Sequence, residues 1–78
     1  MGEFRMPSLG SDMDSGKLMN WRVKVGDQVK RGDIMAEIET DKSLLEFETF
    51  EDGVVEQILV EPGTTAPVGT ALAILRPA

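Results

Sequence analysis

One lysine stands alone in an acidic stretch of this sequence. Lys42 lies in the middle of "IETDKSLLEF", residues 38–47. The other charged residues between positions 37 and 52 are all carboxylates: Glu37, Glu39, Asp41, Glu46, Glu48, Glu51 and Asp52. Carboxylates favour the protonated ammonium, so they disfavour Lys42 as a base or Schiff-base residue at neutral pH. Two uses remain, a solubilising surface lysine or an attachment point that another protein modifies.

The composition excludes most other chemistry. The chain has no cysteine and no histidine, so it lacks disulfides, thiolate or imidazole metal sites and histidine-dependent triads. We therefore expect no metal ligand and no catalytic residue. The 78 residues allow one small domain, residues 1–78, that buries about 60 to 65% of its unfolded surface. The closing "RPA" is typical of the start of a Pro/Ala linker, which predicts a fragment of a longer multidomain chain.

The charge balance limits the kinds of partner that the chain can bind. Fourteen acidic against eight basic residues give a net charge of -6, which argues against nucleic acid and anionic membranes as partners. The opening "MGEFRMPSLG" lacks the apolar core of a signal peptide, and no apolar run is long enough to span a bilayer. We expect an intracellular, soluble domain that is monomeric when isolated.

The chain repeats itself once. Sliding it by 37 residues lays Asp14–Ile38 over Glu51–Leu75. The identical pairs are Gly16/Gly53, Val23/Val60, Gly26/Gly63, Gly32/Gly69 and Ala36/Ala73. Paired glycines indicate that two halves turn at the same places, although chance similarity of two β-rich segments is the alternative. Two halves of about four short strands predict an all-β fold with pseudo-twofold symmetry, a flattened β-barrel or sandwich of two four-stranded antiparallel sheets.

Short strands fill each half, and no window shows a helical stripe. Met19, Trp21, Val23 and Val25 alternate with polar residues, which predicts a half-buried strand. Trp21 is expected in the core, and the methionines other than Met1 in the core or in loops. The repeat places the symmetry mate of the Lys42 turn where the chain begins and ends. Lys42 should therefore lie at the opposite end of the domain from both termini.

A two-residue turn at Asp41 and Lys42 fixes the register of the surrounding hairpin. It sets Thr40 opposite Ser43, Ile38 opposite Leu45, Ala36 opposite Phe47 and Ile34 opposite Thr49. Neither central residue is glycine or asparagine, so a type I turn is expected rather than a primed turn. Glu37 then lies directly opposite Glu46, which should be mildly unfavourable for folding. An unfavourable pair of like charges at this position indicates a functional surface.

A resemblance follows from these segments. "ETDKS", preceded by "GDxVxxGD" and followed by "FEDGVVEQILVEPGTTAPVGT", is similar to the lipoyl domain of the acyltransferase component of 2-oxo acid dehydrogenase complexes. The similarity extends to "EFRMPSLGSDMDSG" at the start. It implies the two-sheet barrel, lipoic acid in amide linkage to Lys42, and roles for Glu39 and Gly53 in recognition by the lipoylating enzyme. For Glu39 the alternative is a solvated strand face, and for Gly53 a turn with unusual backbone angles.

The resemblance also implies partners and a compartment. The lipoyl arm would transfer acyl groups and reducing equivalents between a thiamine-dependent 2-oxo acid dehydrogenase, the acyltransferase core and dihydrolipoamide dehydrogenase. Such a domain is a carrier without catalysis of its own, in the cytoplasm of a bacterium or the mitochondrial matrix of a eukaryote. Partners are expected to contact the exposed residues near the lysine and in the loop Leu9–Gly16. These candidates are Asp12, Asp14, Asp41, Ser43, Leu44 and Glu46.

Two positions depart from the family pattern, and two alternatives remain. Ser43 stands where alanine is common, and Leu44 where a smaller or β-branched residue is usual; exposure of Leu44 beside Glu39 would indicate partner contact. Biotinyl carrier domains share the architecture but resemble "AMKM" at the attachment site, where this chain has Asp41 and Ser43. An unmodified barrel-sandwich interaction module needs no lysine and usually continues into long helices. An enzyme ranks last.

Overall fold

The computed structural model describes residues 2–8 and 12–77 of the chain. These residues form eight short β-strands separated by turns, as the alternating pattern and the frequent glycines predict. The strands are β1 (Gly2–Arg5), β2 (Ser15–Trp21), β3 (Gln28–Val29), β4 (Ile34–Glu39), β5 (Leu44–Glu48), β6 (Gly53–Ile58), β7 (Thr65–Pro67) and β8 (Ala71–Arg76). In the part of the chain described, we find no helix with the length and apolarity that crossing a membrane requires.

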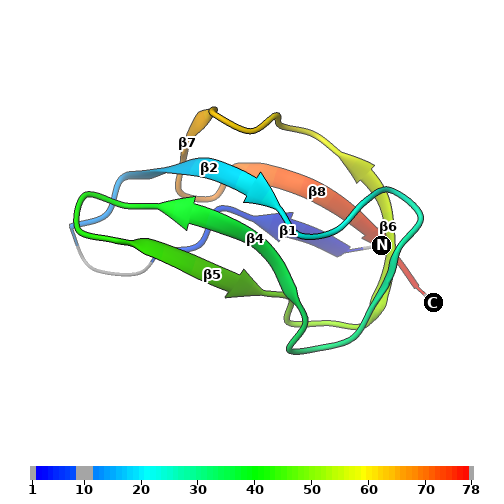
Figure 1. Ribbon diagram of the computed structural model, residues 1–78. Helices are drawn as coiled ribbons and strands as arrows, with labels where there is room; N and C mark the ends of the chain where they lie inside the picture. Colours follow the sequence, from blue (N-terminus) through cyan, green and yellow to red (C-terminus); the bar gives the residue numbers. More distant parts are fainter. Residues whose placement is uncertain (1, 9–11, 78) are drawn as a thin grey trace.

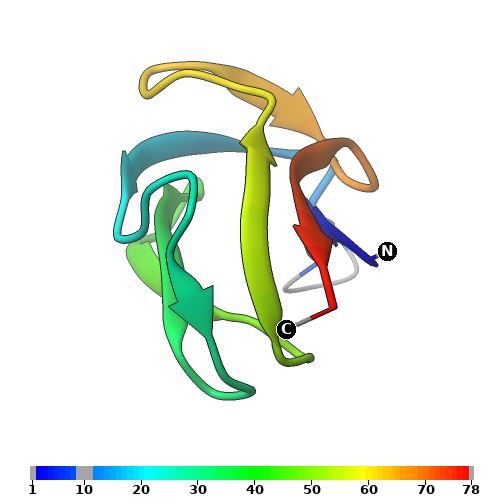
Figure 2. The same ribbon diagram turned by 90° about the vertical axis from the view of Figure 1, so that its right-hand side faces the viewer.

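The strands build two four-stranded sheets with the orders β1-β8-β6-β3 and β5-β4-β2-β7. All neighbouring strands in both sheets pair antiparallel. The sheets enclose one core and form a flattened barrel with extents of 34 × 21 × 17 Å (Figure 1). Viewed from the end that carries both termini, the strands surround the core on all sides (Figure 2). The predicted fold class is confirmed.

The repeat in the sequence is a repeat of structure. Strands β5, β4, β2 and β7 occupy the same places in one sheet as β1, β8, β6 and β3 in the other. The pairing of β2 with β4 shifts register between Leu18 and Asn20, and that of β6 with β8 shifts between Val55 and Gln57, 37 residues later. Even the β-bulges are therefore repeated, which supports the predicted pseudo-twofold.

The paired glycines mark the turns of the two halves. Gly26 and Gly63 have φ angles of 97° and 93°, and Gly32 and Gly69 have 96° and 93°. Side chains with a Cβ rarely adopt such angles, which explains why glycine recurs at these positions. The two halves turn at the same places, as the repeat predicts.

The core lies between the sheets and consists mainly of aliphatic side chains. Its buried members are Phe4, Met6, Leu18, Val29, Met35, Ala36, Ile38, Phe47, Val55, Ala66, Leu72, Ala73 and Leu75. Trp21 packs against this cluster, lies edge-on to Phe4 with ring centroids 6.2 Å apart, and donates its indole N–H to the Val60 carbonyl at 3.0 Å. Trp21 therefore has its predicted place at the core, with its one polar group satisfied.

The strand predicted through Val23 and Val25 is shorter in the structure. β2 ends at Trp21, and Val25 lies in the turn before Gly26 with 60% of its surface exposed. Within β2 the bulge breaks the alternation, so Leu18 is buried while Met19 is only partly buried. A bulge adds one residue to a strand, which a strict period of two cannot anticipate.

Candidate functional site

Strands β4 and β5 form a hairpin that ends in the lysine turn, residues 40–43. The Thr40 N–H donates to the Ser43 carbonyl at 2.8 Å, so Asp41 and Lys42 are the two residues between the paired positions. The next pairs are Glu39–Leu44, Ile38–Leu45, Glu37–Glu46 and Ala36–Phe47. Neither Asp41 nor Lys42 has a positive φ, which excludes a primed turn. The predicted register near the lysine and the prediction of an unprimed turn are confirmed.

Farther from the lysine turn the register differs from the prediction. Ile34 pairs with Glu48 and not with Thr49, because a β-bulge between Ile34 and Ala36 sets two residues of β4 against one of β5. As a result Met35 and Ala36 are both buried, whereas strict alternation would bury only one of them. Two adjacent buried residues anchor β4 in the core just before the segment that leads to Lys42.

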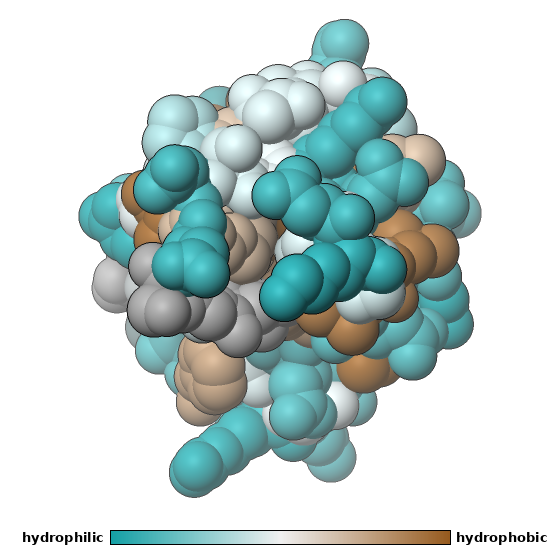
Figure 3. Space-filling model, turned by 90° about the vertical axis from the view of Figure 1, so that its left-hand side faces the viewer, coloured by the Kyte–Doolittle hydropathy of each residue, from teal (hydrophilic) through white to brown (hydrophobic). Residues whose placement is uncertain are grey.

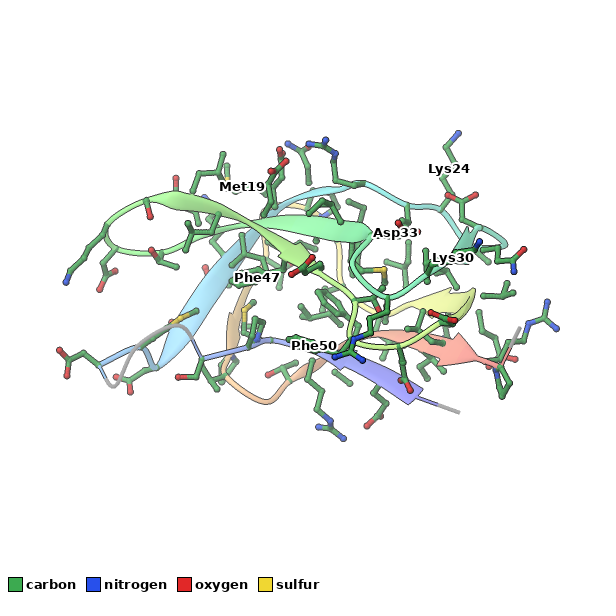
Figure 4. All side chains as sticks on the ribbon, turned by 90° about the horizontal axis from the view of Figure 1, so that it is seen from below. Met19, Lys24, Lys30, Asp33, Phe47 and Phe50 are labelled. Carbon is green, nitrogen blue, oxygen red and sulfur yellow. The ribbon has the colours of Figure 1, made fainter. Side chains whose placement is uncertain are left out.

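The turn between β4 and β5, which carries Lys42, lies at one end of the domain, and both termini lie at the other, as predicted (Figure 1). The Lys42 side chain is exposed, and within residues 2–8 and 12–77 its ammonium takes part in no ion pair. Lys24 and Lys30 lie on the loops before and after β3, far from the lysine turn (Figure 4). Lys17 is within β2, opposite Glu39. Lys42 is therefore the one lysine of the described residues that stands on a tight hairpin turn.

Most predicted recognition residues surround this lysine on the surface. Glu39, Asp41, Ser43 and Leu44 are all exposed. Leu44 has 54% of its surface exposed and pairs with Glu39, which confirms that the two lie side by side. The end of the molecule that faces the viewer in Figure 3 combines hydrophilic side chains with neighbouring hydrophobic surface. The surface next to Lys42 therefore combines carboxylates with an apolar side chain.

Glu46 belongs to an ionic cluster on the outer face of the same sheet. Arg22 Nη1 lies 2.9 Å from Glu37 Oε2 and 3.2 Å from Glu46 Oε2. The Asn20 side-chain amide donates to the other oxygen of Glu37 at 2.9 Å. Glu37 and Glu46 are opposite each other, as predicted. Arg22, which the prediction of a mildly unfavourable pair did not include, bridges the two carboxylates and offsets their repulsion. The sequence carried one signal of this cluster, since Asn20 and Arg22 are polar positions of the alternating pattern from which a strand was predicted.

Asp12 and Asp14 precede β2, and both are exposed. Lys17 pairs with Glu39, so the start of β2 lies at the same end of the domain as the lysine turn. The Asp14 carbonyl accepts a hydrogen bond from the Val68 N–H at 2.9 Å, which ties this segment to the loop after β7. Both aspartates are therefore placed to extend the acidic surface. The other residues predicted for this contact loop, Leu9, Gly10 and Ser11, lie outside the described residues.

Gly53 lies away from the lysine turn. It is the first residue of β6 and pairs with Val29, and the next residue pairs with Arg76 at the end of β8. Gly53 is not among the glycines with positive φ, so the expected need for unusual backbone angles is wrong. A Cβ at this position would lie 2.7 Å from the Arg76 carbonyl oxygen, so close packing of β6 on β8 explains the glycine. Its role in recognition by a lipoylating enzyme stays a prediction.

The chemistry of the site is that of one accessible primary amine. A covalently attached group needs an amine that an enzyme can reach and a rigid support, and Lys42 on the hairpin fulfils both requirements. Among the residues described, no group of three or more His, Cys, Asp and Glu side chains is arranged to hold a metal ion. Fold and site together are those of a small β-sandwich domain with an exposed lysine on the turn of one hairpin.

Comparison with known proteins names the family. A family profile for biotin and lipoyl attachment, described as "Biotin-requiring enzyme", matches residues 2–75. A solved lipoyl domain of the 2-oxoglutarate dehydrogenase complex from Azotobacter vinelandii superposes with a TM-score of 0.75 and 31% identity, over 95% of this chain and 94% of that one. The chain therefore belongs to the family of biotinyl and lipoyl attachment domains, as its sequence predicted.

Two longer relatives are similar to the chain over most of its length. Both are dihydrolipoyllysine-residue acetyltransferase components of pyruvate dehydrogenase complexes. The one from Zymomonas mobilis is 49% identical over 74 residues, which are 94% of this chain and 17% of the relative. The one from Staphylococcus aureus is 40% identical over 70 residues, which are 90% of this chain and 16% of the relative. The chain thus spans about a sixth of the length of these relatives.

Proposed function

We propose that this chain is a carrier domain in which Lys42 holds lipoic acid through an amide bond. The observation that carries the proposal is the exposed amine on the lysine turn, at the end of the domain opposite both termini. The solved lipoyl domain and the two acetyltransferase relatives support lipoic acid over biotin as the attached group. Asp41 and Ser43 in place of the methionines of "AMKM" support the same choice.

The contribution of the chain itself is to hold the lipoyl-lysine where partner enzymes can reach it. When bound, the lipoyl group supplies a dithiolane for acyl transfer from a thiamine-dependent 2-oxo acid dehydrogenase to coenzyme A at an acyltransferase core, with reoxidation by dihydrolipoamide dehydrogenase. The buried residues of β4 hold the hairpin rigid, and the lysine turn projects the amine beyond the core. Glu39, Asp41 and Leu44 give the surrounding surface the features that partners recognise.

The position of the termini fits a tethered domain. Both chain ends lie opposite Lys42, so a covalent connection at either end leaves the lysine turn free to enter another active site (Figure 1). We propose that the domain is one part of a longer acyltransferase chain, which the length of the two relatives supports. A tether converts encounters with the partner enzymes into intramolecular events at high effective concentration.

The experiment that tests this proposal is intact-mass measurement. The domain is incubated with a lipoylating enzyme, ATP and lipoate, and in parallel with a biotinylating enzyme, ATP and biotin. We expect the mass increase of one lipoyl group in the first reaction and no increase in the second. Lys42→Arg keeps the charge and should accept no lipoate. Modification of that variant at Lys17, Lys24 or Lys30, or biotin uptake by the parent domain, would overturn the assignment.

A further inference from the structure

The side chain of Thr40 spans the lysine turn. Its hydroxyl donates to the Ser43 carbonyl at 3.1 Å. The same hydroxyl oxygen lies within accepting distance of the Lys42 N–H at 3.4 Å and of the Ser43 N–H at 3.3 Å. Each of the two accepted bonds is long and weak by itself. Together with the backbone bond from Thr40 to Ser43, four contacts join one residue to the lysine turn.

The turn needs such support because of its sequence. A two-residue hairpin connection usually contains glycine or asparagine in a primed turn, and this one has Asp41 and Lys42 without positive φ. The backbone N–H groups of Lys42 and Ser43 then require another acceptor or water. A threonine hydroxyl is both donor and acceptor, and it can cap a short turn in this way. The Thr40 hydroxyl is the side-chain group that lies within reach of both N–H groups.

The pseudo-twofold shows that the contact is local to the lysine. Strand β4 corresponds to β8, and β5 corresponds to β1, so the equivalent of the lysine turn is the gap between the two chain ends. The fold is therefore complete in one half without any such turn. Thr40 serves the presentation of Lys42 and not the closure of the barrel.

We propose that Thr40 is a positioning residue for the modification of Lys42, acting through its hydroxyl on the backbone of the lysine turn. The inference rests on the proposed lipoylation of Lys42. In that reaction the ε-amine attacks the carboxyl carbon of lipoate activated as its adenylate. The new amide C–N bond replaces the C–O bond to phosphate, AMP leaves, and the amine releases a proton. Thr40 takes no part in these bond changes and only fixes where the amine stands.

The test compares variants of Thr40 in the lipoylation assay. Thr40→Val keeps the shape and β-branching but removes the hydroxyl, and Thr40→Ser keeps the hydroxyl. Thr65→Val on β7 is the matched control, because no hydrogen bond of its hydroxyl is found in the described residues. We expect kcat/KM for the lipoylating enzyme to fall about fivefold for Thr40→Val, the scale of one lost hydrogen-bonding group. Thr40→Ser and Thr65→Val should stay within about twofold of the parent.

A second measurement reports the conformation of the lysine turn. In NMR spectra of the unmodified domains, the amide signals of Lys42 and Ser43 should shift and exchange faster with solvent in Thr40→Val than in Thr40→Ser or Thr65→Val. Equal lipoylation of Thr40→Val and parent would overturn the inference while leaving Lys42 as the site. A parent domain that takes up no lipoate would instead overturn the proposed function. Slow lipoylation of Thr40→Ser would also contradict the proposed role of the hydroxyl, because serine keeps the hydroxyl group.

Discussion

Glu37 on β4 and Glu46 on β5 are direct cross-strand neighbours, and they share one guanidinium. Arg22 Nη1 lies 2.9 Å from the first carboxylate and 3.2 Å from the second. Like charges in this arrangement would repel, but the bridging cation compensates them. Glu37 is the more buried partner, with 19% of its side chain exposed against 53% for Glu46, so removal of Arg22 leaves a partly buried carboxylate next to another one.

We expect substitutions of Arg22 and Glu46 in this ionic cluster to change the stability of the domain by different amounts. Arg22→Gln should lower the free energy of unfolding by about 0.5 to 1 kcal/mol, the upper range for partly exposed ion pairs. Glu46→Gln should change it by no more than a few tenths of a kcal/mol, because the loss of attraction to Arg22 offsets the loss of repulsion from Glu37. Urea melts followed by fluorescence of Trp21, the single tryptophan, measure both. Adding Glu46→Gln to Arg22→Gln should restore part of the loss, and failure to do so would contradict the bridging role.

The hairpin could be predicted near Lys42 but not farther along. Between Ile38 and Leu45 the register follows from a two-residue turn and the alternation of apolar residues, and the structure agrees. The bulge at Ile34–Ala36 has no sequence signature, because any residue can supply the extra position. Local periodicity describes one strand at a time. Contacts between segments, such as those of Arg22 with Glu37 and Glu46, depend on how the residue after β2 is placed relative to β4 and β5.

The two halves diverge where the site is built. By the repeat, the counterparts of Arg22 and Glu37 are Leu59 and Ile74 in the other sheet. Leu59 is 41% exposed and Ile74 is partly buried, so the equivalent surface is apolar and not ionic. Matching glycines predicted the shared backbone correctly. The side chains that distinguish the sheets carry no such signal, because the fold tolerates either kind of residue on its outer faces.

Gly53→Ala should destabilise the domain by about 1 to 3 kcal/mol, because the new Cβ would meet the Arg76 carbonyl oxygen at 2.7 Å and one of the two backbones must move. Urea melts measure the loss in free energy of unfolding. Intact-mass measurement of the folded variant reports how fast it is lipoylated. We expect the folded variant to be lipoylated at the rate of the parent, because β6 begins far from the lysine turn. A variant of normal stability that resists lipoylation would instead restore the role in recognition that the sequence predicted.

Exchanging Asp41 and Lys42 moves the lysine by one position without changing composition or net charge. Neighbouring side chains on a β-hairpin point in different directions, so the amine would leave the lysine turn on another side. We expect the initial rate of lipoylation of Asp41→Lys/Lys42→Asp to fall at least about tenfold, as expected when a reacting group is displaced by an ångström or more. The melts should resemble those of the parent, since both positions are exposed. Equal rates, measured by intact mass over time, would show that the placement of the amine does not matter.

The acidic surface around the lysine turn should accelerate encounters with a basic partner surface. Lipoylation removes the ammonium of Lys42, which changes the net charge from -6 to -7. Asp41 then lies next to the modified residue, and Glu39, which pairs with Lys17 across the sheet, lies at the end of β4. Opposite charges steer association, and salt screens them over about 8 Å at physiological ionic strength. We therefore expect lipoylated Glu39→Gln/Asp41→Asn to be reductively acylated more slowly by its dehydrogenase, about three- to tenfold at low salt, and the gap to close as salt rises.

The matched comparison is lipoylated Glu37→Gln/Glu46→Gln, which removes the same number of carboxylates from the same hairpin. Arg22 already compensates the charges of Glu37 and Glu46. Removing both carboxylates leaves the Arg22 cation unpaired, so the surface becomes less negative, as it does in Glu39→Gln/Asp41→Asn. This change in charge lies farther from Lys42 along the hairpin. Because β-strands rise about 3.3 Å per residue, Glu37 lies several ångströms farther from the arm than Glu39 and is screened more strongly. We expect a smaller loss of acylation rate at low salt and the same rate as the parent at high salt. Equal losses for the two double variants, or losses that persist at high salt, would mean that these carboxylates make direct contacts with the dehydrogenase and do not act through long-range attraction.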